Sequence, residues 1–183
     1  MPTKPVSLEQ RVQRLEDIEA IRTLKSRYHT LVNDTQFEKV GDLFTMDATL
    51  DLAYLMPDGK TIIGREAISA AFVAMKTAKS QSQLKQFLHN HIVEIEGEDA
   101  ASGTGLLLAC YGVKEESFVV AGKYMEHYRR VDGAWLFRRM ELALYFTVPL
   151  KTGWAEHKRH YLINSGESIP EYKELLPNPP VAP

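Results

Sequence analysis

The chain has 183 residues, of which 44% are hydrophobic and 25% are charged, and its formal net charge is −2 at pH 7. This composition is typical of a globular domain and excludes the disordered and fibrous classes. Because the 24 acidic and 22 basic residues are mixed along the chain, we expect no nucleic-acid partner. No apolar run reaches the ~20 residues that span a bilayer, so we expect no membrane partner either.

The amino end and the single cysteine indicate a reducing compartment. Met-Pro-Thr-Lys-Pro leads into a charged helical pattern without the apolar stretch of a signal peptide, so we expect a cytoplasmic protein. Cys110 alone excludes an internal disulfide and a thiolate metal site within one chain. We expect Cys110 to be a small buried side chain in a strand.

Helical patterns occupy the first part of the chain. Ser7 and Gln10 have the spacing of a capping box, and apolar residues recur every three or four positions over residues 8–31. This predicts a long amphipathic helix whose apolar stripe covers one face of a sheet. Thr35 and Glu38 have the same capping-box spacing and predict a short second helix.

Strand patterns follow. Residues 48–54 and 60–63, joined by Met-Pro-Asp-Gly, predict a hairpin, and residues 66–75 predict a third helix. Four long β-rich runs then predict an antiparallel meander. They cover residues 87–95, 100–113, 117–131 and 134–148. Because strands of this length tend to bend, we predict an α+β domain whose curved sheet and helices wrap a deep, largely apolar pocket.

The order of these elements, with the segments VEIEGEDAASGTG and YMEHYRRVDGAWLF, resembles the SnoaL-like branch of the NTF2-like superfamily over residues 18–149. That branch includes scytalone dehydratase, a bile-acid 7α-dehydratase and a hexachlorocyclohexane dehydrochlorinase. The resemblance implies a cone-shaped α+β fold, a curved mixed or antiparallel sheet wrapped around N-terminal helices, at residues 1–153. Residues 154–183 would be an extension packing on the domain or on a neighbouring subunit. It further implies a homo-oligomer, a trimer ahead of a dimer, formed through the convex sheet face.

The family's catalytic positions are only partly retained. Its tyrosine on the first helix corresponds to Tyr28, and its aspartate falls on Asn33, with Asp34 one residue later. Its histidine falls on Gln86, shortly before His89. Either a short gap restores Asp34 and His89 as the acid–base pair, or the pocket performs a different elimination. Asp34 has the alternative role of a cap at the start of the second helix.

Two histidines mark the predicted central strand. His89 and His91 are two residues apart, so strict alternation places both on one face. A pocket-facing histidine suits proton transfer near neutral pH; the alternative is a solvent-facing pair on the outer sheet surface. Without a third ligand, they predict no metal site. The remaining candidates for substrate binding are polar or aromatic: Asn33, Tyr54, Gln86, Asn90, Tyr111, Tyr124, Arg139 and Tyr145.

Together these residues predict a lyase or isomerase that needs no cofactor and acts on a hydrophobic aromatic or polycyclic small molecule. Asp34 or His89 would take a proton, and Tyr28 would hydrogen-bond the oxygen that changes charge. Loss of formaldehyde from a lignin-derived diaryl compound is a variant that needs no strong carbon base. The alternatives are a non-catalytic binding protein for apolar metabolites, and an assembly subunit whose cone is filled with side chains.

Overall fold

The computed structural model describes residues 7–52, 61–77, 82–113, 116–151 and 153. The predicted hairpin turn, Tyr54 and the predicted extension at 154–183 lie outside the described residues. Helix α1 (Leu8–Asn33) begins with the predicted capping box: the Ser7 side chain accepts a hydrogen bond from the Gln10 backbone N–H, and the Gln10 side chain accepts one from the Ser7 N–H. No helix in the described part of the chain is long and apolar enough to cross a membrane.

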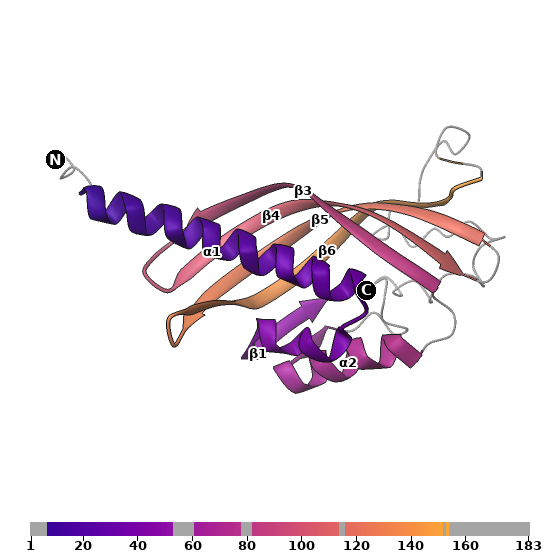
Figure 1. The fold of residues 1–183 in the computed structure, drawn as a ribbon, viewed down its shortest axis with the longest axis horizontal. Helices are drawn as coiled ribbons and strands as arrows, with labels where there is room; N and C mark the ends of the chain where they lie inside the picture. The colour runs from indigo at the N-terminus through magenta and orange to yellow at the C-terminus, as the bar shows by residue number, and fades with distance from the viewer. Residues whose placement is uncertain (1–6, 53–60, 78–81, 114–115, 152, 154–183) are drawn as a thin grey trace.

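Helix α1 packs on the sheet from Asp17 onward. Ile21 and Tyr28 are fully buried, whereas Leu8 and Leu15 are 71% and 66% exposed. Figure 1 shows the first turns of the helix extending past the end of the strands. The long amphipathic helix is confirmed, and its apolar stripe meets the sheet in the later turns of α1 while its first turns lie beyond the strands.

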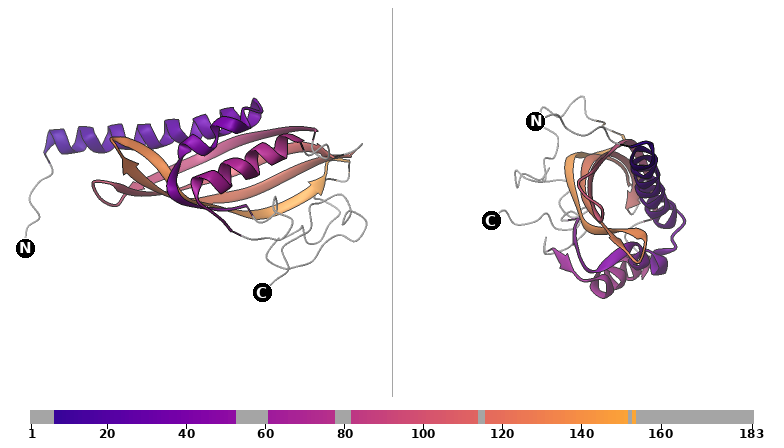
Figure 2. Two further views of the ribbon diagram at one scale, coloured as in Figure 1. Left: turned by 90° about the horizontal axis from the view of Figure 1, so that it is seen from below. Right: turned by 90° about the vertical axis from the view of Figure 1, so that its left-hand side faces the viewer.

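The sheet has six strands in the order β2-β1-β6-β5-β4-β3. Their bounds are β1 (Phe44–Asp51), β2 (Ile62–Ile63), β3 (Ser82–Ile95), β4 (Ala100–Val113), β5 (Glu116–Val131) and β6 (Ala134–Pro149). The meander β3 to β6 is antiparallel as predicted, and β1 pairs parallel with β6, so the sheet is mixed. The long strands curl, and α1 lies along the open side of the curve (Figure 2). The α+β class and the curved sheet are thus confirmed.

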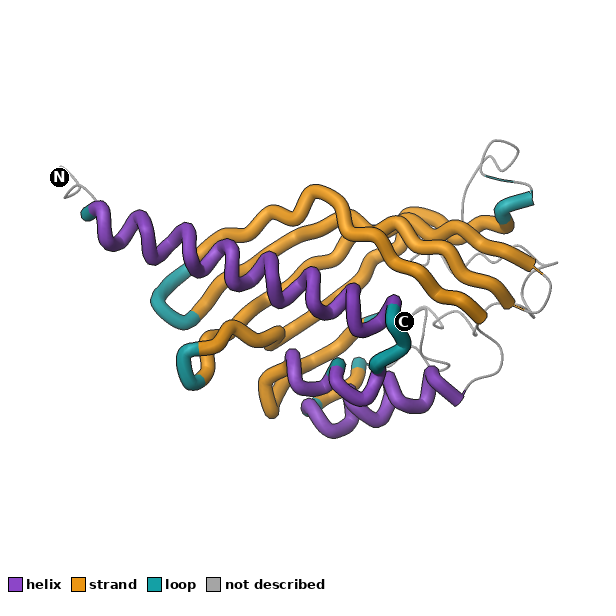
Figure 3. Tube along the Cα trace, viewed as in Figure 1, coloured by secondary structure: helices purple, strands orange, loops and turns teal. Residues whose placement is uncertain are grey.

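The predicted second helix is replaced by two 3-10 turns, η1 (Phe37–Lys39) and η2 (Gly41–Leu43). The Thr35 and Glu38 capping box does not form, because Thr35 has a φ of 56° and its hydroxyl donates to the Asp34 carbonyl oxygen. The third helix is confirmed as α2 (Arg65–Thr77). Figure 3 shows the 3-10 turns and α2 gathered beside β1, whereas α1 packs mainly along the edge strand β3 and reaches β6 across the curve of the sheet.

The β5–β6 turn anchors α1 at mid-length. Asp132 and Gly133 both have positive φ, 50° and 79°, which suits a tight turn between antiparallel strands. Just after this turn, the Trp135 indole N–H donates to the Asp17 carboxylate (3.1 Å), which Arg130 also contacts at 2.6 Å. These contacts set how α1 lies along the strands, and therefore which of its residues face the concave side.

Alternation along β4 decides which side chains face the helix. Residues 101, 103, 105, 107, 109 and 111 are buried on the concave side. Cys110 falls between them and is exposed, so the prediction of a buried cysteine is wrong. The predicted strand is confirmed as β4, but its sequence does not show which of its two faces points inward.

Candidate functional site

A completely buried ion pair joins α1 to β5. Lys25 lies one turn from Ile21 on the buried face of α1, and its ammonium donates to Glu126 Oε1; both side chains are 0% exposed. The Lys25 nitrogen also lies 3.3 Å from the centroid of the Tyr124 ring and 5.0 Å from that of Tyr28. Aromatic faces and one carboxylate thus replace water around the ammonium.

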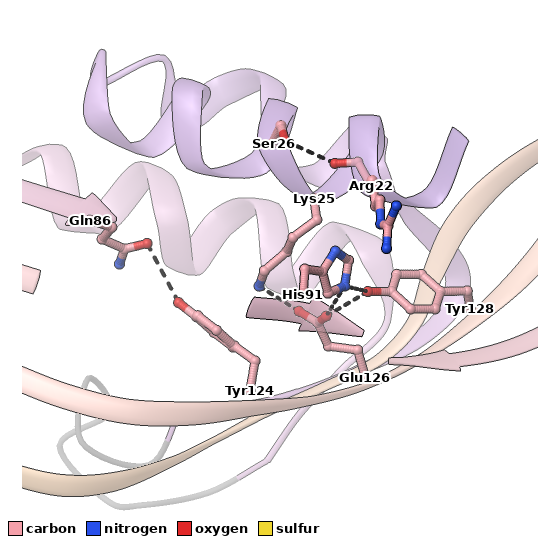
Figure 4. Close-up of polar contacts among 8 residues, drawn as sticks. All are labelled: Arg22, Lys25, Ser26, Gln86, His91, Tyr124, Glu126 and Tyr128. Carbon is pink, nitrogen blue, oxygen red and sulfur yellow. Dashed lines mark hydrogen bonds and ion pairs between the residues drawn. The ribbon is translucent and has the colours of Figure 1, made fainter. Parts of the chain in front are cut away.

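The second oxygen of Glu126 completes a four-residue network (Figure 4). The Tyr128 hydroxyl donates to Glu126 Oε2 at 2.5 Å, and His91 Nε2 lies 3.4 Å from the same oxygen and 3.1 Å from the hydroxyl. Burial by itself would raise the pKa of Glu126, but the Lys25 charge and the hydrogen bonds from His91, Lys25 and Tyr128 lower it to about 2. The side chain is therefore a carboxylate at neutral pH.

A β-bulge turns His91 toward this carboxylate. His89 pairs with Leu106 and Ile92 with Thr104, so β3 carries one residue more than β4 at this point, and Asn90 there has a φ of 48°. The bulge interrupts the alternation of side chains. His89 is consequently exposed, while the His91 side chain is 7% exposed and faces inward. The prediction that the two histidines share a face is wrong for this reason.

A glycine on β4 makes room for His91. A Cβ atom at Gly103 would lie 3.0 Å from Tyr128 Cε2 and 3.2 Å from His91 Nε2, both closer than ordinary contact. Any larger residue would push these two rings apart. Gly103 therefore allows the imidazole and the phenol to approach one another above the sheet.

The orientation of His91 is that of a general base held by a carboxylate. Its Nε2 faces Glu126 and Tyr128, and its Nδ1 is buried without a hydrogen-bond partner. When Nε2 carries the proton and donates it toward Glu126, Nδ1 keeps a lone pair that can accept a proton from a bound molecule. The described residues contain no group of three or more His, Cys, Asp or Glu side chains that could hold a metal ion.

A second cluster of polar side chains lies beside the network, where Tyr28 and His29 of α1 meet Gln86 of β3 and Tyr124 of β5. The Tyr124 hydroxyl lies 3.5 Å from Gln86 Oε1, and Tyr28 packs edge-on against both Tyr124 and His29. His29 is 6% exposed, and neither of its ring nitrogens has a hydrogen-bond partner. Burial and the Lys25 charge lower the pKa of His29 to about 3, so the imidazole is neutral. Burial likewise raises the pKa of Tyr28, which keeps its hydroxyl protonated.

Asn33, which the resemblance places at the position of the family aspartate, holds α1 to β3. Its side-chain N–H donates to the Gln86 carbonyl oxygen at 2.8 Å, and its side-chain oxygen accepts from the Gln86 N–H at 2.7 Å. Both amide groups are thus engaged with backbone. Asp34 is exposed and ends α1, with its N–H bonded to the Thr30 carbonyl, so the prediction that it caps a following helix is wrong.

The structure brings together four of the residues that were predicted from the sequence: Tyr28, Asn33, Gln86 and Tyr124. His89 and Asn90 are exposed, as is Tyr145 at 44%. Exposed on β6, Arg139 forms an ion pair with Glu141 at 2.7 Å. Tyr111 is buried and stacks on Phe118 with ring centroids 5.1 Å apart.

With this geometry established, the family can be identified. Residues 13–141 match the SnoaL-like domain model. The chain belongs to the SnoaL-like domain family. A protein assigned as a scytalone dehydratase from Novosphingobium aromaticivorans DSM 12444 is 21% identical (TM-score 0.66), covering 74% of this chain and 88% of its own. Hexachlorocyclohexane dehydrochlorinase LinA-type3 from Novosphingobium barchaimii LL02 is 20% identical (TM-score 0.66), covering 82% and 97%.

A third similar structure is an NTF2-like protein with a cystatin-like fold from Novosphingobium aromaticivorans, 25% identical with a TM-score of 0.56, covering 77% of this chain and 92% of its own. A search among curated proteins finds no significant match. The NTF2-like fold expected from the sequence is therefore confirmed.

Two members of this SnoaL-like domain's buried network, Lys25 and Glu126, were not found from the sequence. Each carries a signal that can be read in retrospect. Lys25 interrupts the apolar stripe of α1 between Ile21 and Tyr28, in phase with both. Glu126 lies between Tyr124 and Tyr128 on the same buried face of β5, which is otherwise lined by apolar residues. A charge on the buried face of each of two neighbouring elements is the pattern of an internal ion pair.

Proposed function

We propose that this SnoaL-like domain is a cofactor-independent lyase or isomerase in which His91, oriented by Glu126, takes a proton from a hydrophobic aromatic or polycyclic substrate. The observation that carries the proposal is the buried network of Lys25, Glu126, Tyr128 and His91. A buried ion pair stabilises a fold no better than apolar side chains of the same volume. Its presence beside an imidazole with a free nitrogen therefore favours catalysis over folding as its role.

In an elimination, the roles are as follows. His91 Nδ1 accepts the proton from a carbon next to the leaving group, the C–H electron pair becomes the new double bond, and the leaving group departs with the electrons of its own bond. The Glu126 carboxylate stabilises the imidazolium that forms. In this proposal His91 and Glu126 take the places that the sequence suggested for His89 and Asp34, which are exposed.

The names of two structural neighbours, a dehydratase and a dehydrochlorinase, favour loss of water or halide. Loss of formaldehyde from a lignin-derived diaryl compound is the alternative elimination. There an ionised phenol first expels the hydroxyl group of the attached carbon as water, with a proton from the site, to form a quinone methide. A base then takes the hydroxymethyl proton, the C–C bond breaks to release formaldehyde, and the electron pair of that bond becomes the new double bond while the phenolate is restored.

A non-catalytic binding protein for apolar metabolites is the second candidate function. It is favoured by Asn33, whose amide occupies the family aspartate's position and is engaged with the backbone of β3. In this case the buried network would only orient a ligand.

A turnover screen over phenolic diaryl compounds, steroids and polyketides separates the two functions. The key variant is His91→Gln, and the matched control is His89→Gln, which changes an exposed histidine two residues away on the same strand. We expect His91→Gln to lower kcat/KM by roughly 10²- to 10⁴-fold, and the control to leave it within about twofold. Equal effects of the two substitutions contradict the site. If compounds of the library raise the Tm of the protein but none is converted, the result supports the non-catalytic binding function.

A further inference from the structure

His29 is a buried polar side chain that the catalytic proposal does not use. It lies on α1 one turn after Lys25 and is 6% exposed, and neither ring nitrogen has a partner in good hydrogen-bond geometry, although the Gln86 side chain is close enough to affect the pKa of the imidazole. Leaving a buried polar group without a partner destabilises a folded protein, and most such groups in native structures are satisfied. A buried imidazole without a well-formed hydrogen bond, beside a candidate active site, can therefore gain a hydrogen bond from a bound molecule.

We propose that His29, together with Gln86 and Tyr124, binds the hydroxyl group of a phenol on the substrate. The proposal rests on the proposed function, because it names the substrate class of that same site. The imidazole accepts the hydrogen bond from the phenol through its unprotonated nitrogen. The Gln86 amide and the Tyr124 hydroxyl, 3.5 Å apart, supply the other polar atoms of the subsite.

Charge favours a neutral hydroxyl over an anion. The Lys25 ammonium, one turn away on α1, is already paired with Glu126, with both side chains fully buried. A ligand carboxylate would therefore not gain the Lys25 charge as a free partner and would lose its hydration. A neutral imidazole offers one donor and one acceptor, which suits a hydroxyl.

Aromatic rings around His29 favour a phenol over an aliphatic alcohol. The Tyr28 ring centroid lies 5.3 Å from that of His29 with planes at 84°, and the Tyr124 centroid lies 5.7 Å away at 79°. Phe72 continues this cluster at 6.0 Å from Tyr28, again edge to face. Aryl ligands gain from such edge-to-face contacts beyond the area that they bury.

The test measures how tightly the full chain binds two probes, 4-fluorophenol and 4-fluoroanisole, by ¹⁹F NMR titration. The ether carries a methyl group in place of the hydroxyl proton and so cannot donate a hydrogen bond. Wild-type protein should bind the phenol about 10-fold more tightly than the ether, the worth of one hydrogen bond. His29→Phe should abolish that preference. His89→Phe, at the exposed histidine of β3, is the matched control and should retain it.

Thermal unfolding distinguishes a binding role from a structural one. If His29 has no structural partner, His29→Phe should leave the Tm unchanged or raise it by a few degrees. In the wild type, the His29 ring resonances should shift with the phenol and not with the ether, a measurement that needs no variant.

The proposal is overturned if His29→Phe keeps the preference, if it unfolds or loses several degrees of Tm, or if wild-type protein does not prefer the phenol. Failure of the lyase proposal is distinguishable, since His91→Gln should lose turnover while keeping the phenol preference. If no library compound is converted and His29→Phe still abolishes the preference, the subsite stands and the lyase does not.

Discussion

Removing one member of the buried Lys25–Glu126 pair should destabilise the protein more than removing both. Lys25→Met leaves a carboxylate, and Glu126→Gln an ammonium, in a site where both side chains are 0% exposed. Each single substitution should lower the free energy of unfolding by about 3–5 kcal/mol. The double variant has no buried charge, and its glutamine can still accept the hydrogen bond from Tyr128. We therefore expect it to be more stable than either single variant.

The pKa shifts of the two partners affect the stability of the folded protein in opposite directions. A folded-state pKa of about 2 for Glu126, against an ordinary 4.5, corresponds to roughly 3 kcal/mol in favour of the folded state at neutral pH. Burial lowers the pKa of Lys25 in the same pair, and for a cation this opposes folding at neutral pH. The two contributions have opposite signs, so only the unpaired charge is strongly unfavourable.

Urea unfolding of the four proteins measures this coupling. Arg139→Met and Glu141→Gln, which break the exposed ion pair on β6, are the control cycle; there each change should amount to less than about 1 kcal/mol. Additive effects at Lys25 and Glu126, with the double variant the least stable, would refute the reasoning. As pH falls from about 4.5 through about 2, wild-type stability should decrease because Glu126 becomes protonated, and Glu126→Gln should lack this component.

Three further predictions follow from single contacts. Asn33→Asp should lower the free energy of unfolding by about 1–3 kcal/mol in urea, because a carboxylate cannot donate a hydrogen bond to the Gln86 carbonyl oxygen. Unchanged stability would contradict this role of Asn33. Gly103→Ala should reduce kcat/KM at least tenfold, because the added methyl group displaces His91. The control Gly97→Ala should leave kcat/KM unchanged, because no atom lies within 4 Å of a Cβ at Gly97. We also expect a homo-oligomer, a trimer ahead of a dimer, that forms through the exposed apolar outer face of the sheet, which includes Leu108. Leu108→Glu should therefore reduce the mass measured by light scattering to that of one chain. A monomeric wild-type protein would refute this expectation.

Local patterns in the sequence predicted the elements well. The capping box at Ser7 and the periodicity of residues 8–31 located α1, and the four β-rich runs located the meander, because these signals depend on residues close together in the chain. The Thr35 capping box failed although it is also local. A positive φ at one residue redirects the chain, and the spacing of polar residues does not encode it.

The candidate site was predictable only in part. The sequence by itself determined a SnoaL-like α+β domain and selected Tyr28, Gln86 and Tyr124 as candidate site residues, without deciding which face of β3 points inward. Only the tertiary structure decided which polar groups meet, because an extra residue in β3 turns His91 inward and leaves His89 exposed, and because Lys25 meets Glu126 across 101 residues of sequence. Strand register and the packing of a helix on a sheet bring these groups together, and neither leaves a mark within a short window of sequence.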